Sequence, residues 1–195
     1  MQPSVKGTLV AVVLGQVNEL IERRAIPQAE VDQALGADWR NVAKSVSVAP
    51  SAWYPIEFYD RALTLMMNAA GRGDPEYLVE LGRQAAGNLA KQGIYKQLDR
   101  QAPPQADEGF VRSLVTLAKA LYSFTHWELA EFDANANWFV IQVTGAGEYP
   151  ESLRWRNVGF LEAMTSAAIR RPCRVTSERG PRDTIRFRVE WTQPR

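Results

Sequence analysis

The chain has 195 residues, of which 46% are hydrophobic and 23% charged, a composition that suits one domain with a buried core. Its longest apolar stretch near the start, residues 9–14, is far shorter than the roughly 18–20 residues of a membrane-spanning helix. The single cysteine, Cys173, cannot form an internal disulfide and suits a reducing compartment. We therefore expect a single domain over residues 1–195 that is cytoplasmic, with neither a membrane span nor a secretory signal peptide.

The net charge of +1 is unevenly distributed, because residues 1–150 carry 13 basic and 17 acidic side chains whereas residues 151–195 carry 10 and 5. Clustered arginines can bind phosphate groups. Arg186 and Arg188, however, alternate with apolar residues as on a half-buried strand, and Glu178, Asp183 and Glu190 interrupt the basic run. We expect no nucleic-acid partner.

Helical spacing of apolar residues dominates the first two thirds of the chain. The segments with this spacing are residues 7–24, 56–70, 75–89 and 107–124, and residues 28–48 form one or two shorter helices. Asp74 and Asp107 precede two of these segments and are expected to cap them. Residues 49–55 connect helices, and residues 97–107, with Pro103 and Pro104, are expected to be a loop.

From His126 onward the pattern changes to that of strands. Strands are expected at residues 126–132 and 138–143, then a helix at 153–168, then a hairpin of residues 173–176 and 184–191 around a polar turn at 177–183. The predicted fold class is α+β, with an N-terminal helical layer packed on a C-terminal antiparallel sheet of about four strands. One helix lies between strands two and three.

Catalytic and metal-binding motifs are missing from the sequence. His126 is the only histidine, which nearly excludes a catalytic triad or a two-histidine metal site, and together with Cys173 it supplies too few ligands for zinc. Residues 145–150 begin like a dinucleotide-binding loop but lack its third glycine, so we expect a hairpin or a strand-to-helix turn. We expect no enzymatic activity, no cofactor and no metal.

Large aromatic and sulfur-containing side chains are the remaining signal, with six tryptophans in the chain. They either fill the core or line an apolar pocket. The candidate ligand-binding residues are Trp127, Trp138, Phe160 and Met164.

The first helix carries apolar residues around more of its circumference than one core stripe needs, with Leu9 and Val12 in surplus, which favours a homodimer.

Three C-terminal runs, residues 156–164 (RNVGFLEAM), 172–175 (PCRV) and 184–191 (TIRFRVEW), resemble the ending of the 4-vinyl reductase domain superfamily. The chain looks most similar to an uncharacterised group of myxobacterial proteins of about this length, which share its Val5-Lys6-Gly7 opening and its Tyr54-Pro55 pair. The resemblance implies helices packed on an antiparallel sheet, a homodimer, and an internal pocket in which relatives sense small hydrophobic molecules.

The chain lacks two features of the proteins that it resembles. Sensory members hold zinc through a cysteine-rich loop, but residues 177–184 contain no cysteine, so zinc is not carried over. Haem-based nitric oxide sensors are similar in length and opening but need a haem-ligating histidine and a Tyr-x-Ser-x-Arg clamp, which the run Tyr122-Ser123-Phe124-Thr125 does not supply. We expect a non-enzymatic regulatory or sensory module that binds a small apolar ligand. The alternatives are a protein-interaction scaffold with a filled core and, third, an enzyme without a recognisable motif.

Overall fold

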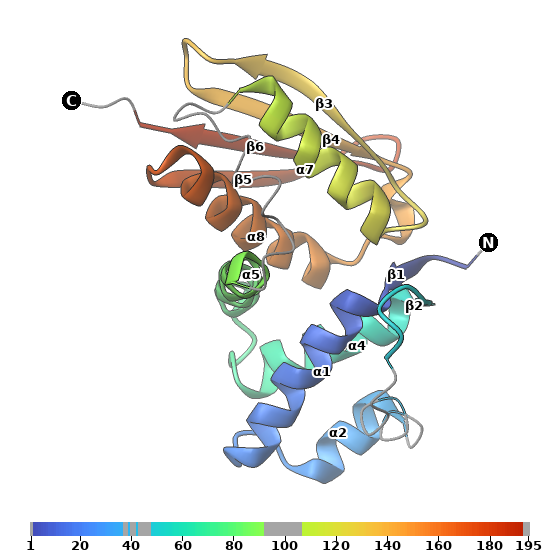
Figure 1. Ribbon diagram of the computed structural model, residues 1–195. Coiled ribbons are helices and arrows are strands. Elements are labelled where there is room, and N and C mark those ends of the chain that lie inside the picture. The colour runs from blue at the N-terminus through green and yellow to red at the C-terminus, as the bar shows by residue number, and fades with distance from the viewer. Residues whose placement is uncertain (1, 37–38, 40–41, 43–47, 92–106, 193–195) are drawn as a thin grey trace. The chain divides into compact units, whose positions relative to one another are not determined.

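The computed structural model describes residues 2–36, 39, 42, 48–91 and 107–192. The chain divides into two compact units, the first formed by residues 1–78 and 121–124 and the second by residues 79–120 and 125–195 (Figure 1). The loop expected before position 107 and the second half of the segment 28–48 lie outside the described residues, apart from positions 39, 42 and 48.

The first unit contains helices α1 (Gly7–Glu22), α2 (Gln28–Leu35) and α4 (Ile56–Ala69), with α1 and α2 both packed on α4. Its core side chains are fully or almost fully buried, and they include Val10, Val13, Val17, Leu63 and Met66. Two strands, β1 (Ser4–Lys6) and β2 (Trp53–Pro55), form an antiparallel pair that the sequence did not predict. Each strand has only three residues, too few to show an alternating pattern.

Both expected helix caps are confirmed. Helix α5 (Pro75–Lys91) follows Asp74, whose Oδ1 accepts a hydrogen bond of 2.9 Å from the backbone N–H of Glu76. Helix α7 (Glu108–Leu121) follows Asp107, whose Oδ1 accepts a bond of 2.7 Å from the N–H of Phe110. In each case a carboxylate satisfies an amide that has no partner within the helix.

The second unit is built on a four-stranded antiparallel sheet, which confirms the predicted α+β class. Its strands are β3 (His126–Asp133), β4 (Trp138–Thr144), β5 (Cys173–Gly180) and β6 (Thr184–Trp191), in the order β3-β4-β6-β5. The short 3-10 helix η1 (Ala146–Glu148) and helix α8 (Glu151–Ile169) lie between β4 and β5, as expected for the helix between strands two and three.

Strand β5 is longer than the sequence predicted. It continues through Ser177 and Glu178 to Gly180, so that only residues 181–183 remain as the turn. Arg182 and Asp183 adopt positive φ angles of 57° and 54° there. The prediction was wrong because polar residues were assigned to a turn, whereas on an edge strand they face water.

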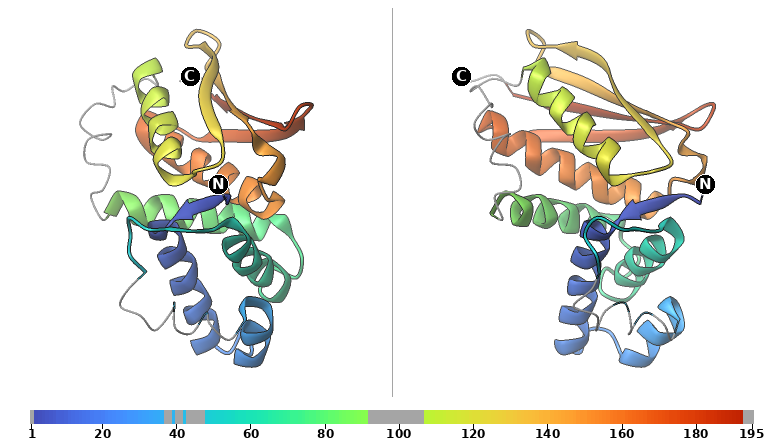
Figure 2. Two further views of the ribbon diagram at one scale, coloured as in Figure 1. Left: turned by 90° about the vertical axis from the view of Figure 1, so that its right-hand side faces the viewer. Right: turned by 45° about the vertical axis from the view of Figure 1, so that its right-hand side comes forward.

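The two faces of this sheet differ sharply. Helices α7 and α8 cover one face, here called the inner face (Figure 2). The inner-face residues of the two central strands are fully buried, namely Phe139, Ile141, Val143, Ile185, Phe187 and Val189. Residues of opposite parity, among them Arg186 and Arg188, lie on the outer face, as their alternation predicted.

Helices α5 and α8 approach each other at two glycines. A Cβ atom added to Gly82 would lie 2.0 Å from the carbonyl oxygen of Arg156, and one added to Gly159 would lie 1.8 Å from that of Val79. The two backbones are therefore in direct contact, which only residues without a side chain permit. Among the helices that the structure describes, none has the length and apolar character needed to cross a membrane.

Candidate functional site

Trp127 lies on the inner face of β3 and is 3% exposed. Its ring stacks on that of Phe187, with centroids 5.8 Å apart and an interplanar angle of 8°. The ring of Tyr149 lies 6.3 Å away at a tilt, and the indole N–H donates a hydrogen bond of 3.0 Å to Oγ1 of Thr125. Protein rings therefore already occupy at least one face of this tryptophan.

Trp138 lies on the other side of the sheet. It pairs with Glu190 and is one residue before the fully buried Phe139, so strand alternation places it on the outer face. The guanidinium carbon of Arg188 lies 4.2 Å from its ring centroid. Trp127 and Trp138 consequently cannot line one internal pocket.

The other two candidate ligand-binding residues are one helical turn apart on α8. Met164 is buried and Phe160 is half-buried. The backbone nitrogen of Phe160 lies at the α5–α8 contact, 2.8 Å from the position of a Cβ on Gly82. Their role in binding a ligand remains a prediction.

A network of charged groups joins the start of α8 to strand β5. Glu151 accepts hydrogen bonds from Arg154 at 2.7 Å and from Arg179 at 2.7 and 2.9 Å. Arg179 also donates to the carbonyl oxygens of Ala146 and Tyr149. Burial raises the pKa of Glu151, but these hydrogen bonds and the two positive charges outweigh burial and hold the pKa below its ordinary value.

Sequence reasoning missed this network. The spacing of Glu151 and Arg154 is a recognisable helical pair, but nothing in the sequence indicates that Arg179 reaches the same carboxylate. Residues 145–150 form the expected strand-to-helix turn, and the N–H of Ala146 donates to the carbonyl of Asp183 at 2.7 Å. Since β4 is antiparallel to both neighbours, no βαβ unit surrounds this turn.

His126 and Cys173 are the two side chains best suited to bind a metal, but neither lies in a favourable environment for it. His126 is exposed and lies on the outer face of β3, opposite Thr144. Burial raises the pKa of the Cys173 thiol to about 11, so the thiol is protonated at neutral pH. Within the described residues, no three His, Cys, Asp or Glu side chains are grouped so that they could hold a metal ion.

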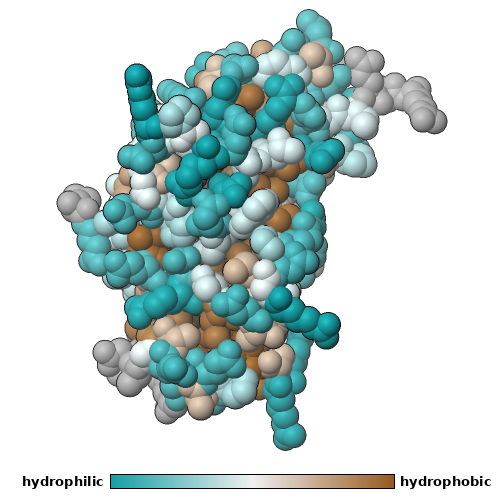
Figure 3. Space-filling model, turned by 180° about the vertical axis from the view of Figure 1, so that it is seen from behind, coloured by the Kyte–Doolittle hydropathy of each residue, from teal (hydrophilic) through white to brown (hydrophobic). Residues whose placement is uncertain are grey.

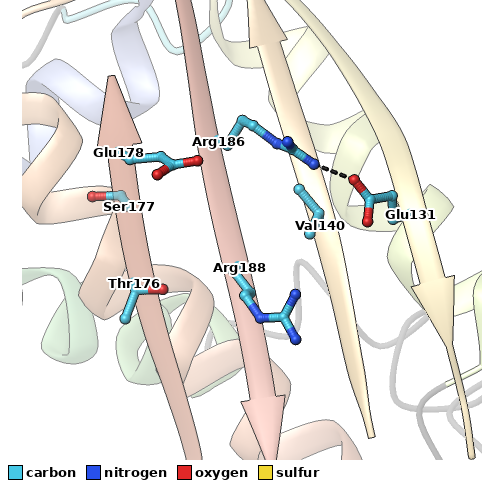
Figure 4. Close-up of a pocket in the computed structure, with 7 residues that line it drawn as sticks. All are labelled: Glu131, Val140, Thr176, Ser177, Glu178, Arg186 and Arg188. Atoms are coloured by element: carbon cyan, nitrogen blue, oxygen red, sulfur yellow. Dashed lines mark hydrogen bonds and ion pairs between the residues drawn. The ribbon is translucent and has the colours of Figure 1, made fainter. Parts of the chain in front are cut away.

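The outer face of the sheet carries a hollow of about 400 Å³ (Figure 4). All four strands contribute to its lining, which consists of Glu131, Val140, Thr176, Ser177, Glu178, Arg186 and Arg188. Arg186 forms an ion pair with Glu131, and Arg188 forms one with Glu190 at 2.5 Å. Each of these two arginines therefore has a carboxylate partner.

No family model and no curated protein matches the chain. Solved structures of H-NOX domains share its fold at low sequence identity. An Fe(II) unliganded H-NOX protein from K. algicida is 11% identical with a TM-score of 0.64, and the comparison covers 97% of each chain. A Cs H-NOX mutant carrying 4-cyano-L-phenylalanine is 16% identical with a TM-score of 0.65, again over 97% of each chain.

A third structure is an oxygen-binding H-NOX domain related to soluble guanylate cyclases, in its oxygen complex, which is 16% identical with a TM-score of 0.63. That comparison covers 97% of this chain and 96% of the other. The resemblance to the 4-vinyl reductase superfamily is therefore wrong. The three runs that suggested it form a helix followed by a hairpin. The chain has the fold of an H-NOX domain.

Proposed function

We propose that this chain is a non-enzymatic sensory or regulatory module that uses the H-NOX fold without a histidine-ligated haem. One observation carries the proposal: the likeness to H-NOX domains covers 97% of this chain, yet its only histidine is exposed on the outer face of the sheet. The similar structures include an oxygen complex and proteins in which haem distortion was probed. Oxygen binding by a domain that is related to soluble guanylate cyclases supports the functional class.

The residues present do not fit such a haem. His126 is directed away from the face that α7 and α8 cover, where the apolar side chains of this unit are buried. Cys173, the other strong iron ligand, is half-buried, and burial raises the pKa of its thiol to about 11, which disfavours the thiolate that binds iron. The sequence also contains no Tyr-x-Ser-x-Arg run at any of its six tyrosines.

A small apolar ligand remains part of the proposal, with Trp127, Phe160 and Met164 as its contacts. Trp138 no longer belongs to this set, because it lies on the outer face. The stacking of Trp127 on Phe187 favours the second candidate, a protein-interaction scaffold with a filled core.

Two measurements test these proposals. Titration with hemin, followed by absorption, should give no saturable one-to-one Soret band, whereas an oxygen-binding H-NOX protein run in parallel should give one. A band that His126→Ala abolishes would contradict the haem-free proposal. Native mass spectrometry of freshly purified protein should show a species heavier than the 21.9 kDa chain, or than its dimer, by the mass of a retained ligand.

The variant Met164→Phe separates the ligand site from the filled core. In a cavity the larger ring replaces the ligand, so the extra mass is lost while the unfolding midpoint stays within a few degrees. In a filled core the ring does not fit, and overpacking of this kind costs about 1–3 kcal/mol. If Met164→Phe loses stability and the unmodified protein carries no ligand mass, the result favours the protein-interaction scaffold with a filled core.

A further inference from the structure

The hollow on the outer face of the four-stranded sheet has features of a binding site. Its volume of about 400 Å³ falls within the range of roughly 300–1,000 Å³ usual for small-molecule sites. Val140 forms an apolar floor, since it is only 3% exposed although it faces away from the helices. Charged side chains surround this floor on both sides (Figure 4).

Two of the charged groups lack full sets of partners. The Nε–H of Arg188 donates to Glu190, and its guanidinium is held over the ring of Trp138. In the described part of the chain, its two Nη groups make no hydrogen bond, and neither does the carboxylate of Glu178. A guanidinium that stacks on a ring is already ordered for two-pronged binding of a carboxylate.

The second arginine adds to the positive side of the hollow. Arg186 lies two residues before Arg188 on the same face of β6, and its ion pair with Glu131 is half-exposed, with side-chain exposures of 37% and 47%. Exposed ion pairs of this kind contribute about 0–1 kcal/mol. Arg186 can therefore turn toward an incoming anion at little cost.

The balance of charge selects the ligand. The lining holds two arginines and two glutamates, and the carboxylate of Glu190 pairs with Arg188 beside them. A simple anion gains from Arg186 and Arg188 but is repelled by Glu131 and Glu178, and a simple cation meets the reverse. A molecule with both charges gains at each end.

The spacing suits a molecule of amino-acid size. Arg188 pairs with Thr176 and Arg186 pairs with Glu178, so Arg188 and Glu178 are diagonal neighbours on adjacent strands, with Cα atoms roughly 7–8 Å apart. The carboxylate and ammonium of an α-amino acid sit on one carbon, so one such molecule bridges the two residues when the side chain of Glu178, unpaired within the described chain, turns toward the guanidinium of Arg188.

We propose that the outer sheet face binds a small zwitterion, an α-amino acid, with its carboxylate on Arg188 and its ammonium on Glu178. Its side chain lies over Val140. The proposal is independent of the haem-free sensory function, because it uses the opposite face of the sheet from Trp127 and Met164.

The test uses three related probes. L-Phenylalanine carries both charges and a ring that can stack on a guanidinium, 3-phenylpropanoate lacks the ammonium, and 2-phenylethylamine lacks the carboxylate. Each is titrated into ¹⁵N-labelled protein while the side-chain Nε–Hε signals of Arg186 and Arg188 are followed. L-Phenylalanine should shift these signals saturably, and each truncated probe should bind at least tenfold more weakly.

Matched variants locate the binding site. Arg188→Gln and Glu178→Gln should each weaken L-phenylalanine binding at least tenfold, in line with the loss of a charged hydrogen bond. Arg174→Gln should change it less than twofold, since Arg174 is an exposed arginine of β5 on the same face but does not line the hollow. The proposal is overturned if no probe shifts the arginine signals, if 3-phenylpropanoate binds as well as L-phenylalanine, or if Arg174→Gln weakens binding as much as Arg188→Gln.

Discussion

The contact between helices α5 and α8 yields the sharpest prediction, the effect of Gly159→Ala. Alanine is better than glycine inside a helix by about 1 kcal/mol, so propensity alone predicts a gain. The new Cβ, however, would lie 1.8 Å from the carbonyl oxygen of Val79, and ordinary contact begins at 3.4 Å. The two helices must separate, and overpacking of this kind costs about 1–3 kcal/mol. Because a contact of 1.8 Å with backbone lies at the severe end of that range, at about 3 kcal/mol, subtracting the propensity gain of about 1 kcal/mol leaves an expected net loss of about 2 kcal/mol.

Chemical denaturation followed by circular dichroism measures this loss. Gly87→Ala is the matched control, because Gly87 is an exposed residue of α5 with no heavy atom within 4 Å of an added Cβ, and it should gain up to about 1 kcal/mol. A chain with two units need not unfold in one step, so amide hydrogen exchange in α8 provides a local readout. If Gly159→Ala is as stable as the parent protein, or gains as Gly87→Ala does, the close helix contact is refuted.

Three further predictions concern other parts of the chain. Because burial raises the pKa of Cys173 to about 11 from an ordinary value of 9.0, we expect its alkylation at pH 8 to be roughly a hundredfold slower than that of an unfolded control, and equal rates would contradict this. The pKa of Glu151 is lowered in the folded state, so its ion pairs stabilise the protein above the unfolded pKa and this contribution is lost as the pH falls through the folded pKa. Glu151→Gln should therefore lower the free energy of unfolding by about 0.5–1 kcal/mol at pH 7 and leave it unchanged at pH 2. A loss of stability that is the same at both pH values would show that it does not come from the ion pairs of Glu151. We also expect a homodimer of about 44 kDa, twice the chain mass of 21.9 kDa, and the variant Leu9→Lys should shift it toward the monomer. A mass of 21.9 kDa at every protein concentration in sedimentation equilibrium would eliminate the dimer.

The dimer prediction concerns half-buried residues of the first unit. Leu9 and Val12 are only partly covered within the described chain, whereas Val10 and Val13 are buried. Figure 3 shows hydrophobic side chains gathered on one face of this unit. The partly exposed side chains of Leu9 and Val12 are what a second copy would cover.

The elements of the fold were predictable where one physical signal dominated. Asp74 and Asp107 identify helix starts because their carboxylates bind free amides, and the helical stripe between positions 56 and 70 is confirmed as α4 within one residue. The residues 138–143, apolar on both faces, predicted a central strand, and β4 indeed lies between β3 and β6.

The candidate site was less predictable because it depends on strand register. Trp127 and Trp138 both belong to predicted strands, but which face each occupies follows from the pairing of Trp127 with Val143 and of Trp138 with Glu190. A shift of one residue reverses every side chain. The close contact at Gly159 could not be predicted either, since a glycine inside a helical stripe does not indicate which helix it touches.

The family resemblance failed for a related physical reason. A helix, a short connection and a hairpin bury their apolar faces in the same way in many α+β folds, so the runs at residues 156–164 and 184–191 indicate this packing and do not identify a family. The order of all the elements is more distinctive, and over that order the chain follows H-NOX domains at only 10–16% identity. A fold tolerates exchange of most side chains provided that the buried pattern is kept, whereas a cofactor depends on a few particular residues. The single histidine lies on an outer strand face, and on this ground we propose that the chain uses the shared fold without a histidine-ligated haem.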